Sequence, residues 1–158
     1  MTEATSFAEI QPEFMARVSR IVWCTVATVD RKGRPRARIL HPIWEGATGW
    51  IATGRQSLKA KHIASTPFVS LSYWDPKHEQ VYADCAAAWE DDIDEKRRLW
   101  DLYKSTPPPL GYDLALFWKS PDDPALGMLK LTPWRIELSA LADLPAGRPP
   151  LVWRPDQA

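Results

Sequence analysis

The chain has 158 residues, a length that fits one domain with a hydrophobic core of its own. Its 20 basic residues balance its 20 acidic residues, so no overall positive field attracts nucleic acid or an anionic membrane. The apolar runs are strand-length, short of the roughly 18–20 residues that span a bilayer. The N-terminus has no basic start followed by an apolar stretch, so we expect no signal peptide and no membrane contact.

Apolar spacing in the first half of the chain predicts one helix and then strands joined by tight turns. Apolar side chains recur at helical intervals over residues 7–20, which predicts an N-terminal helix within residues 1–20. β-branched residues bounded by turn signals then predict strands at residues 22–29, 34–44 and 50–53. A second helix is expected at about 57–65, where Pro67 ends it.

The second half of the chain continues the same alternation of strands and helices. Strands are expected at residues 68–74, 80–89 and 125–141, the last as a pair or as one long bent strand. Helices are expected at residues 90–104 and, shorter, at 114–119. The Pro-rich residues 145–158 read as a linker or arm outside the core. The pattern predicts a mainly β fold, a small barrel of six to seven antiparallel strands with peripheral helices, in a single domain over 1–158.

An arginine-bearing strand is the first candidate for a binding site. In "RPRARIL", Arg34, Arg36 and Arg38 point to one face of the predicted strand. Three adjacent arginines repel one another, so the pattern has two explanations. They form either a charged, exposed edge that prevents strand pairing or a grip for a phosphate group.

The turn "TGRQSLKAKH" is the second candidate. Ser57 is a suitable N-cap, and the free N–H groups of the following first turn favour an anion. Arg55, Lys59 and Lys61 add positive charge around that turn. The segment is either a capped surface helix or a phosphate cradle, and its spacing is not that of a nucleotide-triphosphate P-loop. Because neighbouring strands of a meander lie side by side, we expect Arg36 or Arg38 to face the same anion as Ser57 and Lys59.

The remaining reactive residue types give no catalytic constellation. Cys24 and Cys85 lie in apolar, strand-like segments and are expected to be buried free thiols in a reducing cytoplasm. His41, His62 and His78 lack metal-ligand spacing, and we expect each to be a surface or supporting residue. Any chemistry is therefore expected to come from a cofactor. The nine tryptophans fill a core or line a pocket for a flat ligand, and composition does not decide between these roles.

Residues 20–90 resemble the pyridoxamine-5′-phosphate-oxidase-like split β-barrels. The ordered segments "VDRKGRP", "RARIL", "GWIATGRQSLKAKHI" and "TPFVSLSYW" are similar to that family's hairpin, arginine strand, phosphate turn and following strand. A weaker similarity continues to "LTPWRIEL". Each segment alone is weak, and their order makes the resemblance fairly specific.

The resemblance implies a split barrel that forms a homodimer, with a flavin, usually FMN, at the subunit interface and a small-molecule substrate. In some branches the deazaflavin F420 occupies the same pocket. By position, Arg38 or Arg36 corresponds to the strand arginine near the cofactor phosphate, and Lys59 to the lysine of the phosphate turn. The other cofactor-binding positions that the resemblance or its geometry suggests are Ala52, Thr53, Arg55, Ser57, Lys61, Trp74 and Trp89.

Two departures argue against the oxidase reaction that names the family. Leu58 stands where the oxidases have an arginine, and Arg55 or Lys61 is a candidate replacement. The oxidases' C-terminal "R-x-H" segment is not evident. The sequence therefore favours an FMN-dependent oxidoreductase of another substrate, with F420 as the alternative cofactor. Other hypotheses are a non-catalytic protein that binds flavin or haem and, against the zero net charge, a nucleic-acid-binding barrel.

Overall fold

The computed structural model describes residues 1–155 of the chain. A mixed, strongly twisted sheet forms the centre of the molecule. The helices are α1 (Phe7–Ile21), α2 (Leu58–Ser65) and α3 (Ile93–Ser105), with short 3₁₀ turns η1 (Leu114–Leu116) and η2 (Leu141–Asp143). The strands are β1 (Thr2–Ala4), β2 (Cys24–Val29), β3 (Pro35–Leu40), β4 (Ile43–Glu45), β5 (Thr48–Gly54), β6 (Phe68–Trp74), β7 (Glu79–Glu90), β8 (Leu126–Ala140) and β9 (Leu151–Trp153). None of the described helices combines the length and apolar character needed to cross a bilayer.

The sheet is open between β3 and β5, so the barrel is split. Strands follow the order β1-β9-β8-β7-β6-β2-β3, and β5 pairs with β8 on one side and β4 on the other. All pairs are antiparallel except β1 with β9. β8 is one long strand that carries β5 along its first half and β9 along its second. The mainly β, split-barrel fold class expected from the sequence is confirmed.

Nine strands lie within residues 1–155, more than the six to seven predicted. The predicted strand at 34–44 is two strands, β3 and β4, which are separated at His41 and Pro42. Proline has no N–H to donate to a ladder, so it interrupts the pairing there. β1 and β9, of three residues each, are too short to show a period.

The prediction that residues 145–158 lie outside the core is wrong for β9. Val152 is fully buried and Trp153 nearly so, and Phe7 packs edge-on against the Trp153 ring with centroids 5.1 Å apart. β9 extends the sheet between β8 and β1. Residues 156–158 lie outside the described part of the chain.

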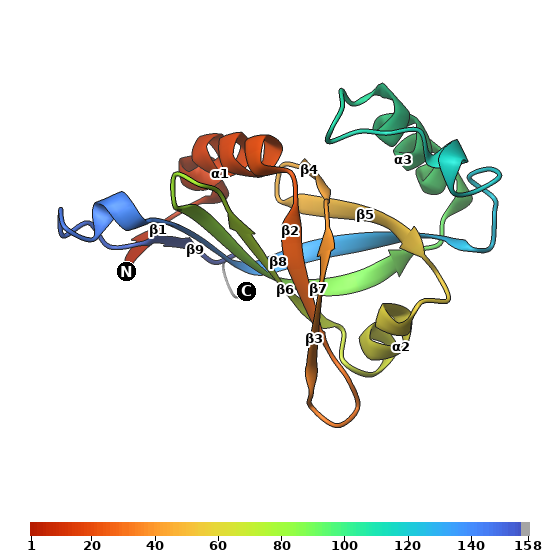
Figure 1. Cartoon of the computed structure of the whole chain (residues 1–158), viewed down its shortest axis with the longest axis horizontal. Helices are drawn as coiled ribbons and strands as arrows, with labels where there is room; N and C mark the ends of the chain where they lie inside the picture. The colour runs from red at the N-terminus through yellow and green to blue at the C-terminus, as the bar shows by residue number, and fades with distance from the viewer. Residues whose placement is uncertain (156–158) are drawn as a thin grey trace.

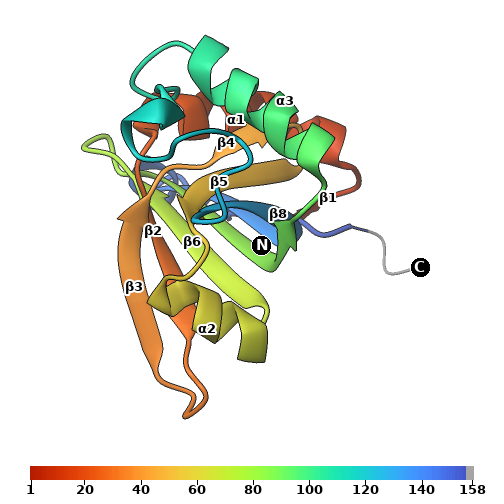
Figure 2. The same ribbon diagram turned by 90° about the vertical axis from the view of Figure 1, so that its right-hand side faces the viewer.

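Two apolar clusters hold the helices on the sheet. α1 packs Ile10, Phe14 and Val18 onto the inner sheet face, where Phe14 meets Trp44 edge-on at 5.0 Å. α3 and the segment after it pack on β5 and the start of β8 through a second cluster that includes Leu99, Tyr103 and Leu114. α1 and α3 therefore cover one end of the sheet, and the β2–β3 hairpin extends away from both (Figure 1). Helix α2 lies beside β3 in both views (Figures 1 and 2).

Cys24 and Cys85 are free and buried, as predicted. Burial raises the pKa of the Cys24 thiol to about 12, so it stays protonated near neutral pH. A protonated, enclosed thiol is a poor nucleophile, which agrees with a packing role.

Candidate functional site

The arginines of β3 point inward. Arg36 pairs across the ladder with Thr28 and Arg38 with Val26, and directly opposed residues share a sheet face. Thr28 and Val26 are almost completely buried. Arg36 and Arg38 therefore lie on the inner face, and the exposed face of β3 carries Ala37 and Ile39. The partly buried Arg38 does not fit the explanation of a charged, exposed edge, whereas Arg36 is exposed and agrees with it.

Arg38 and Lys59 form a cationic cluster with Ser57. The Lys59 Nζ donates a hydrogen bond to Ser57 Oγ at 3.0 Å. Burial and the nearby Arg38 guanidinium lower the pKa of Lys59, so the structure brings the two predicted cations together. Burial and Arg36 likewise lower the pKa of Arg38. Within residues 1–155 neither Arg36, Arg38 nor Lys59 forms an ion pair with a carboxylate, so the cluster has the electrostatics of an anion site.

Ser57 has a different role from the predicted one. Helix α2 begins at Leu58, as expected, but the Ser57 side chain forms no capping hydrogen bond. Its hydroxyl instead accepts from Lys59, and in the first turn the Ala60 N–H bonds the Ser57 carbonyl oxygen, while no side chain within residues 1–155 caps the turn. Free N–H groups and a helix N-terminus favour an anion, and Lys59 points to the same place.

Other predicted cations lie outside this cluster. Arg34 forms an ion pair with Asp30 in the hairpin turn, with 2.7 Å between nitrogen and oxygen. Arg55 lies over the Trp89 ring at 4.5 Å and reaches Asp91 at 3.5 Å. Lys61 is exposed and lines a separate groove beside the hairpin turn. The geometry does not support Arg55 as a replacement for the missing arginine at Leu58, whose side chain is half exposed.

A buried hydrogen-bond relay through Thr28 and His62 holds the Arg38 side chain in position. Its Nη1 donates to Thr28 Oγ1 at 2.8 Å and to the Val26 carbonyl oxygen at 3.3 Å. Thr28 Oγ1 is also 2.8 Å from Nδ1 of the buried His62 in α2. The relay links β3, β2 and α2, and it holds the guanidinium on the side of the cluster. His62 is thus a supporting residue, as the sequence predicted.

Substituting Thr28→Val is expected to destabilise the protein by about 1–3 kcal/mol, because the shape is kept while His62 Nδ1 loses its partner in the buried relay. Urea denaturation measures this loss. Thr25→Val on the same strand is the matched control; Thr25 is half-buried, and a change within about 0.5 kcal/mol is expected there. Equal losses in the two variants would contradict a structural role for the relay.

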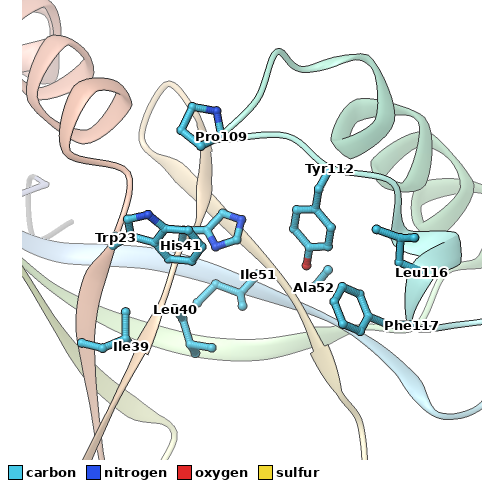
Figure 3. Close-up of a pocket in the computed structure, with 10 residues that line it drawn as sticks. All are labelled: Trp23, Ile39, Leu40, His41, Ile51, Ala52, Pro109, Tyr112, Leu116 and Phe117. Atoms are coloured by element: carbon cyan, nitrogen blue, oxygen red, sulfur yellow. The ribbon is translucent and has the colours of Figure 1, made fainter.

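A cavity of about 440 Å³ opens at the split between β3 and β5 (Figure 3). Its lining residues are Trp23, Ile39, Leu40, His41, Ile51, Ala52, Pro109, Tyr112, Leu116 and Phe117. Trp23 and His41 stand on one side, Tyr112, Leu116 and Phe117 on the other, and Ile51 and Ala52 lie between them (Figure 3). The lining carries no Lys, Arg, Asp or Glu. Such a mostly apolar, aromatic cavity suits a flat organic ring.

Two local backbone features position the aromatic walls. α1 ends at Ile21, and its C-cap Val22 has a φ of 67°, which is unusual for a β-branched residue and turns the chain before Trp23. The other wall includes the strap, residues 106–113 between α3 and η1. A Cβ at Gly111 would lie 2.0 Å from the Thr106 carbonyl oxygen, so only glycine allows the strap to fold in this way before Tyr112. The Tyr112 ring then contacts His41 and Phe117 at centroid distances of 5.2 and 5.9 Å.

Two stretches of chain connect the cationic cluster to the cavity, one in β3 and one that runs from β5 into the turn before α2. Along β3, Arg38 precedes Ile39, Leu40 and His41, and three residues of strand span about 10 Å. Along β5, Ala52 lines the cavity, the buried Thr53 follows, and Ser57 begins the turn into α2. A ligand with a flat ring and a phosphate some 10 Å away fits this arrangement.

Two predicted tryptophans lie elsewhere. Trp74 packs against His78 at the opposite end of β6 from α2, and Trp89 lies under Arg55. Neither lines the cavity. Sequence reasoning missed Trp23, His41, Tyr112 and Phe117. The only signal for them was the general abundance of aromatic residues, because they come from three separate segments that the fold brings together.

Fold and site together define a class: split β-barrels with a cationic cluster beside an aromatic cavity. A sequence profile described as Pyridoxamine 5′-phosphate oxidase matches residues 10–139. The chain belongs to this family. A comparison with curated proteins finds no match.

Solved structures with the same fold have diverse descriptions. One is a Clostridium acetobutylicum protein related to general stress protein 26, with a TM-score of 0.72, 15% identity, and coverage of 94% of this chain and 96% of that one. Another is a Nostoc punctiforme FMN-binding protein related to the oxidase, with a TM-score of 0.64, 16% identity, and coverage of 88% and 86%. The haem storage protein HutZ of Vibrio cholerae has a TM-score of 0.58, 14% identity, and coverage of 78% and 89%.

Proposed function

We propose that this protein is an FMN-dependent oxidoreductase of a small substrate other than pyridoxamine 5′-phosphate. The observation that carries the proposal is the cluster of Arg38 and Lys59, which pairs with no carboxylate within residues 1–155, beside an uncharged, aromatic cavity. The phosphate of FMN would bind Arg38, Lys59, Ser57 and the first turn of α2, with Arg36 adding positive charge. Ala52 and Thr53 would line the path from phosphate to ring.

The bound flavin would supply hydride transfer, and the protein would supply position and exclusion of water. Within the described residues no side chain in the cavity carries a full charge that would serve as an obligatory acid or base. The protein's contribution to catalysis is therefore orientation of a ring between the walls of the cavity.

A second copy of the chain would complete the site. Exposed apolar side chains surround the cavity mouth: Ile39 is 62% exposed, Leu116 75% and Phe117 69%. Among the strands that the structure describes, none pairs with the outer edge of β3. Apolar side chains in such a position are typical of a homodimer interface, and burying them would close the cavity from water. We also propose a cytoplasmic location, which suits the two free thiols.

Titration with FMN and riboflavin tests the proposal. The two ligands share a ring and differ by the phosphate, so FMN is expected to bind at least tenfold more tightly through the cationic cluster. Flavin fluorescence measures both affinities, and size-exclusion chromatography with light scattering reports the dimer. Absence of FMN binding at micromolar concentrations would contradict the proposal.

F420 is the alternative cofactor, since it is also a flat ring with a phosphate. Its deazaflavin fluorescence and the flavin absorption bands distinguish the two in the purified protein. Haem remains the ligand of the non-catalytic alternative, because His41 lies in the cavity wall and one protein of the same fold is described as a haem storage protein. A Soret band on haem titration, with no flavin binding, would favour that alternative.

A further inference from the structure

His41 is the polar feature that distinguishes the cavity wall. Its Nε2 atom is buried and has no hydrogen-bond partner, and among residues 1–155 it is the single buried side-chain nitrogen or oxygen in that condition. An unpaired buried polar group of this kind destabilises the folded state. Proteins seldom keep such a group without a use for it.

The His41 ring is held firmly in position. Trp23 packs edge-on against it with centroids 4.3 Å apart, and Tyr112 contacts it from the other side at 5.2 Å. The imidazole therefore packs in the wall between Trp23 and Tyr112 (Figure 3). Burial lowers the pKa of His41, so the ring is neutral near pH 7 and presents Nε2 as a single donor or acceptor.

The chemistry of the cavity selects the kind of ligand. Its walls are apolar and aromatic, and a charged group placed there would have no opposite charge. The cationic residues lie outside it, on the inner face of β3 and at the start of α2. A flat, uncharged ring with one polar edge would fill the cavity and satisfy His41.

We propose that His41 Nε2 hydrogen-bonds the polar edge of an uncharged planar ring bound in the cavity, and so fixes the orientation of that ring. The inference rests on the proposed function, because the ring belongs either to the cofactor itself or to a substrate that stacks beside it. In both cases the cavity selects uncharged, flat molecules, and phosphorylated substrates are excluded from it.

The experiment compares His41→Leu with the wild-type chain, using His78→Leu as the matched control. His78 also packs against a tryptophan, Trp74, with centroids 5.6 Å apart, but it is exposed and remote from the cavity. In the first arm riboflavin is titrated into each protein, which probes the ring without a phosphate. In the second arm 2-naphthol and 2-naphthyl phosphate are titrated into the FMN-saturated protein by calorimetry.

We expect His41→Leu to weaken binding about tenfold in one arm, and His78→Leu to leave both arms unchanged. Loss in the riboflavin arm identifies the cofactor ring as the partner of His41, and loss in the naphthol arm identifies a substrate. We also expect His41→Gln, which keeps a polar group, to recover part of the affinity. The melting temperature of ligand-free His41→Leu is expected to stay the same or rise, because an unpaired buried nitrogen is removed. A purely structural His41 would lower it.

Unchanged affinity in both arms would overturn the inference, as would 2-naphthyl phosphate binding as tightly as 2-naphthol. The proposed function fails separately. Equal affinities for FMN and riboflavin would contradict the phosphate site, and the His41 dependence of riboflavin binding would still stand.

Discussion

The double substitution Arg38→Ala with Lys59→Ala is expected to weaken FMN binding by at least a hundredfold. A hydrogen bond between a cationic side chain and an anion contributes about 1.5–3 kcal/mol, so the loss of two amounts to roughly 3–6 kcal/mol. Riboflavin has no phosphate, and its affinity is expected to change little. Fluorescence titration of both flavins separates loss of the anion site from general damage to the cavity.

The stability of the ligand-free protein is expected to change less than it does after a typical core substitution. Arg38 and Lys59 repel each other in a half-buried place, and neither has a carboxylate partner within residues 1–155. Removing both relieves that repulsion and offsets the loss of the hydrogen bond from Arg38 to Thr28. We therefore expect the urea midpoint to change by less than a single core truncation would change it.

Lys77→Ala with Lys104→Ala is the control for overall charge. Both lysines are exposed and remote from the cluster, and the pair removes the same two positive charges. FMN affinity is expected to stay within about twofold of the wild-type value, since exposed distant charges are screened by salt. If this control weakens FMN as much as the cluster variant does, long-range charge rather than a local site explains binding.

The sequence was sufficient for the arginine strand and the phosphate turn because both are local. Alternation placed Arg36 and Arg38 on one face, and Ser57 followed by helical spacing placed the start of α2 correctly at Leu58. What alternation does not reveal is which face is buried. The ladder with β2 decides that, since Arg38 is opposite Val26 and therefore points inward.

The cavity could not be predicted in the same way, because its walls are far apart in the chain. Trp23 follows α1, His41 follows β3, and Tyr112 lies in the strap after α3. Only packing of α3 against β5 brings the strap over the split. The unpaired state of His41 Nε2 is likewise a property of three-dimensional surroundings, and its sequence context has no distinguishing pattern.

β9 was missed for a thermodynamic reason. Three residues amid prolines carry too little period to indicate a strand, and tertiary contacts decide their structure. Val152 is completely buried, and β9 pairs on both sides with β8 and β1. A short segment becomes a strand here because the sheet edge supplies hydrogen bonds and the core accepts its side chains.

Tyr103→Phe is expected to destabilise the protein by about 2–4 kcal/mol, the largest loss of stability for removal of a single oxygen atom among the variants considered. The Tyr103 hydroxyl accepts a hydrogen bond from the Ala52 N–H at 3.1 Å and donates one to the Trp50 carbonyl oxygen at 2.8 Å. Trp50 is the last residue of β5 that pairs with β4, and Ala52 lies beyond the end of that ladder, where β5 faces the split. The side chain is 1% exposed, so water does not replace the lost oxygen.

Tyr82→Phe is the matched control for this change. Its hydroxyl donates to Gln80 Oε1 at 3.0 Å on the half-buried outer face, where water can replace it, so a loss below about 1 kcal/mol is expected. Urea denaturation measures both variants, and equal losses would contradict the role of Tyr103 at the strand edge.

Ala52 also lines the cavity, so the loosened backbone of Tyr103→Phe at Ala52 would change the position of any ring bound there. Riboflavin affinity is therefore expected to fall in Tyr103→Phe and to stay unchanged in Tyr82→Phe. Such a result would show that the hydroxyl which completes β5 at the split also maintains the shape of the ligand site.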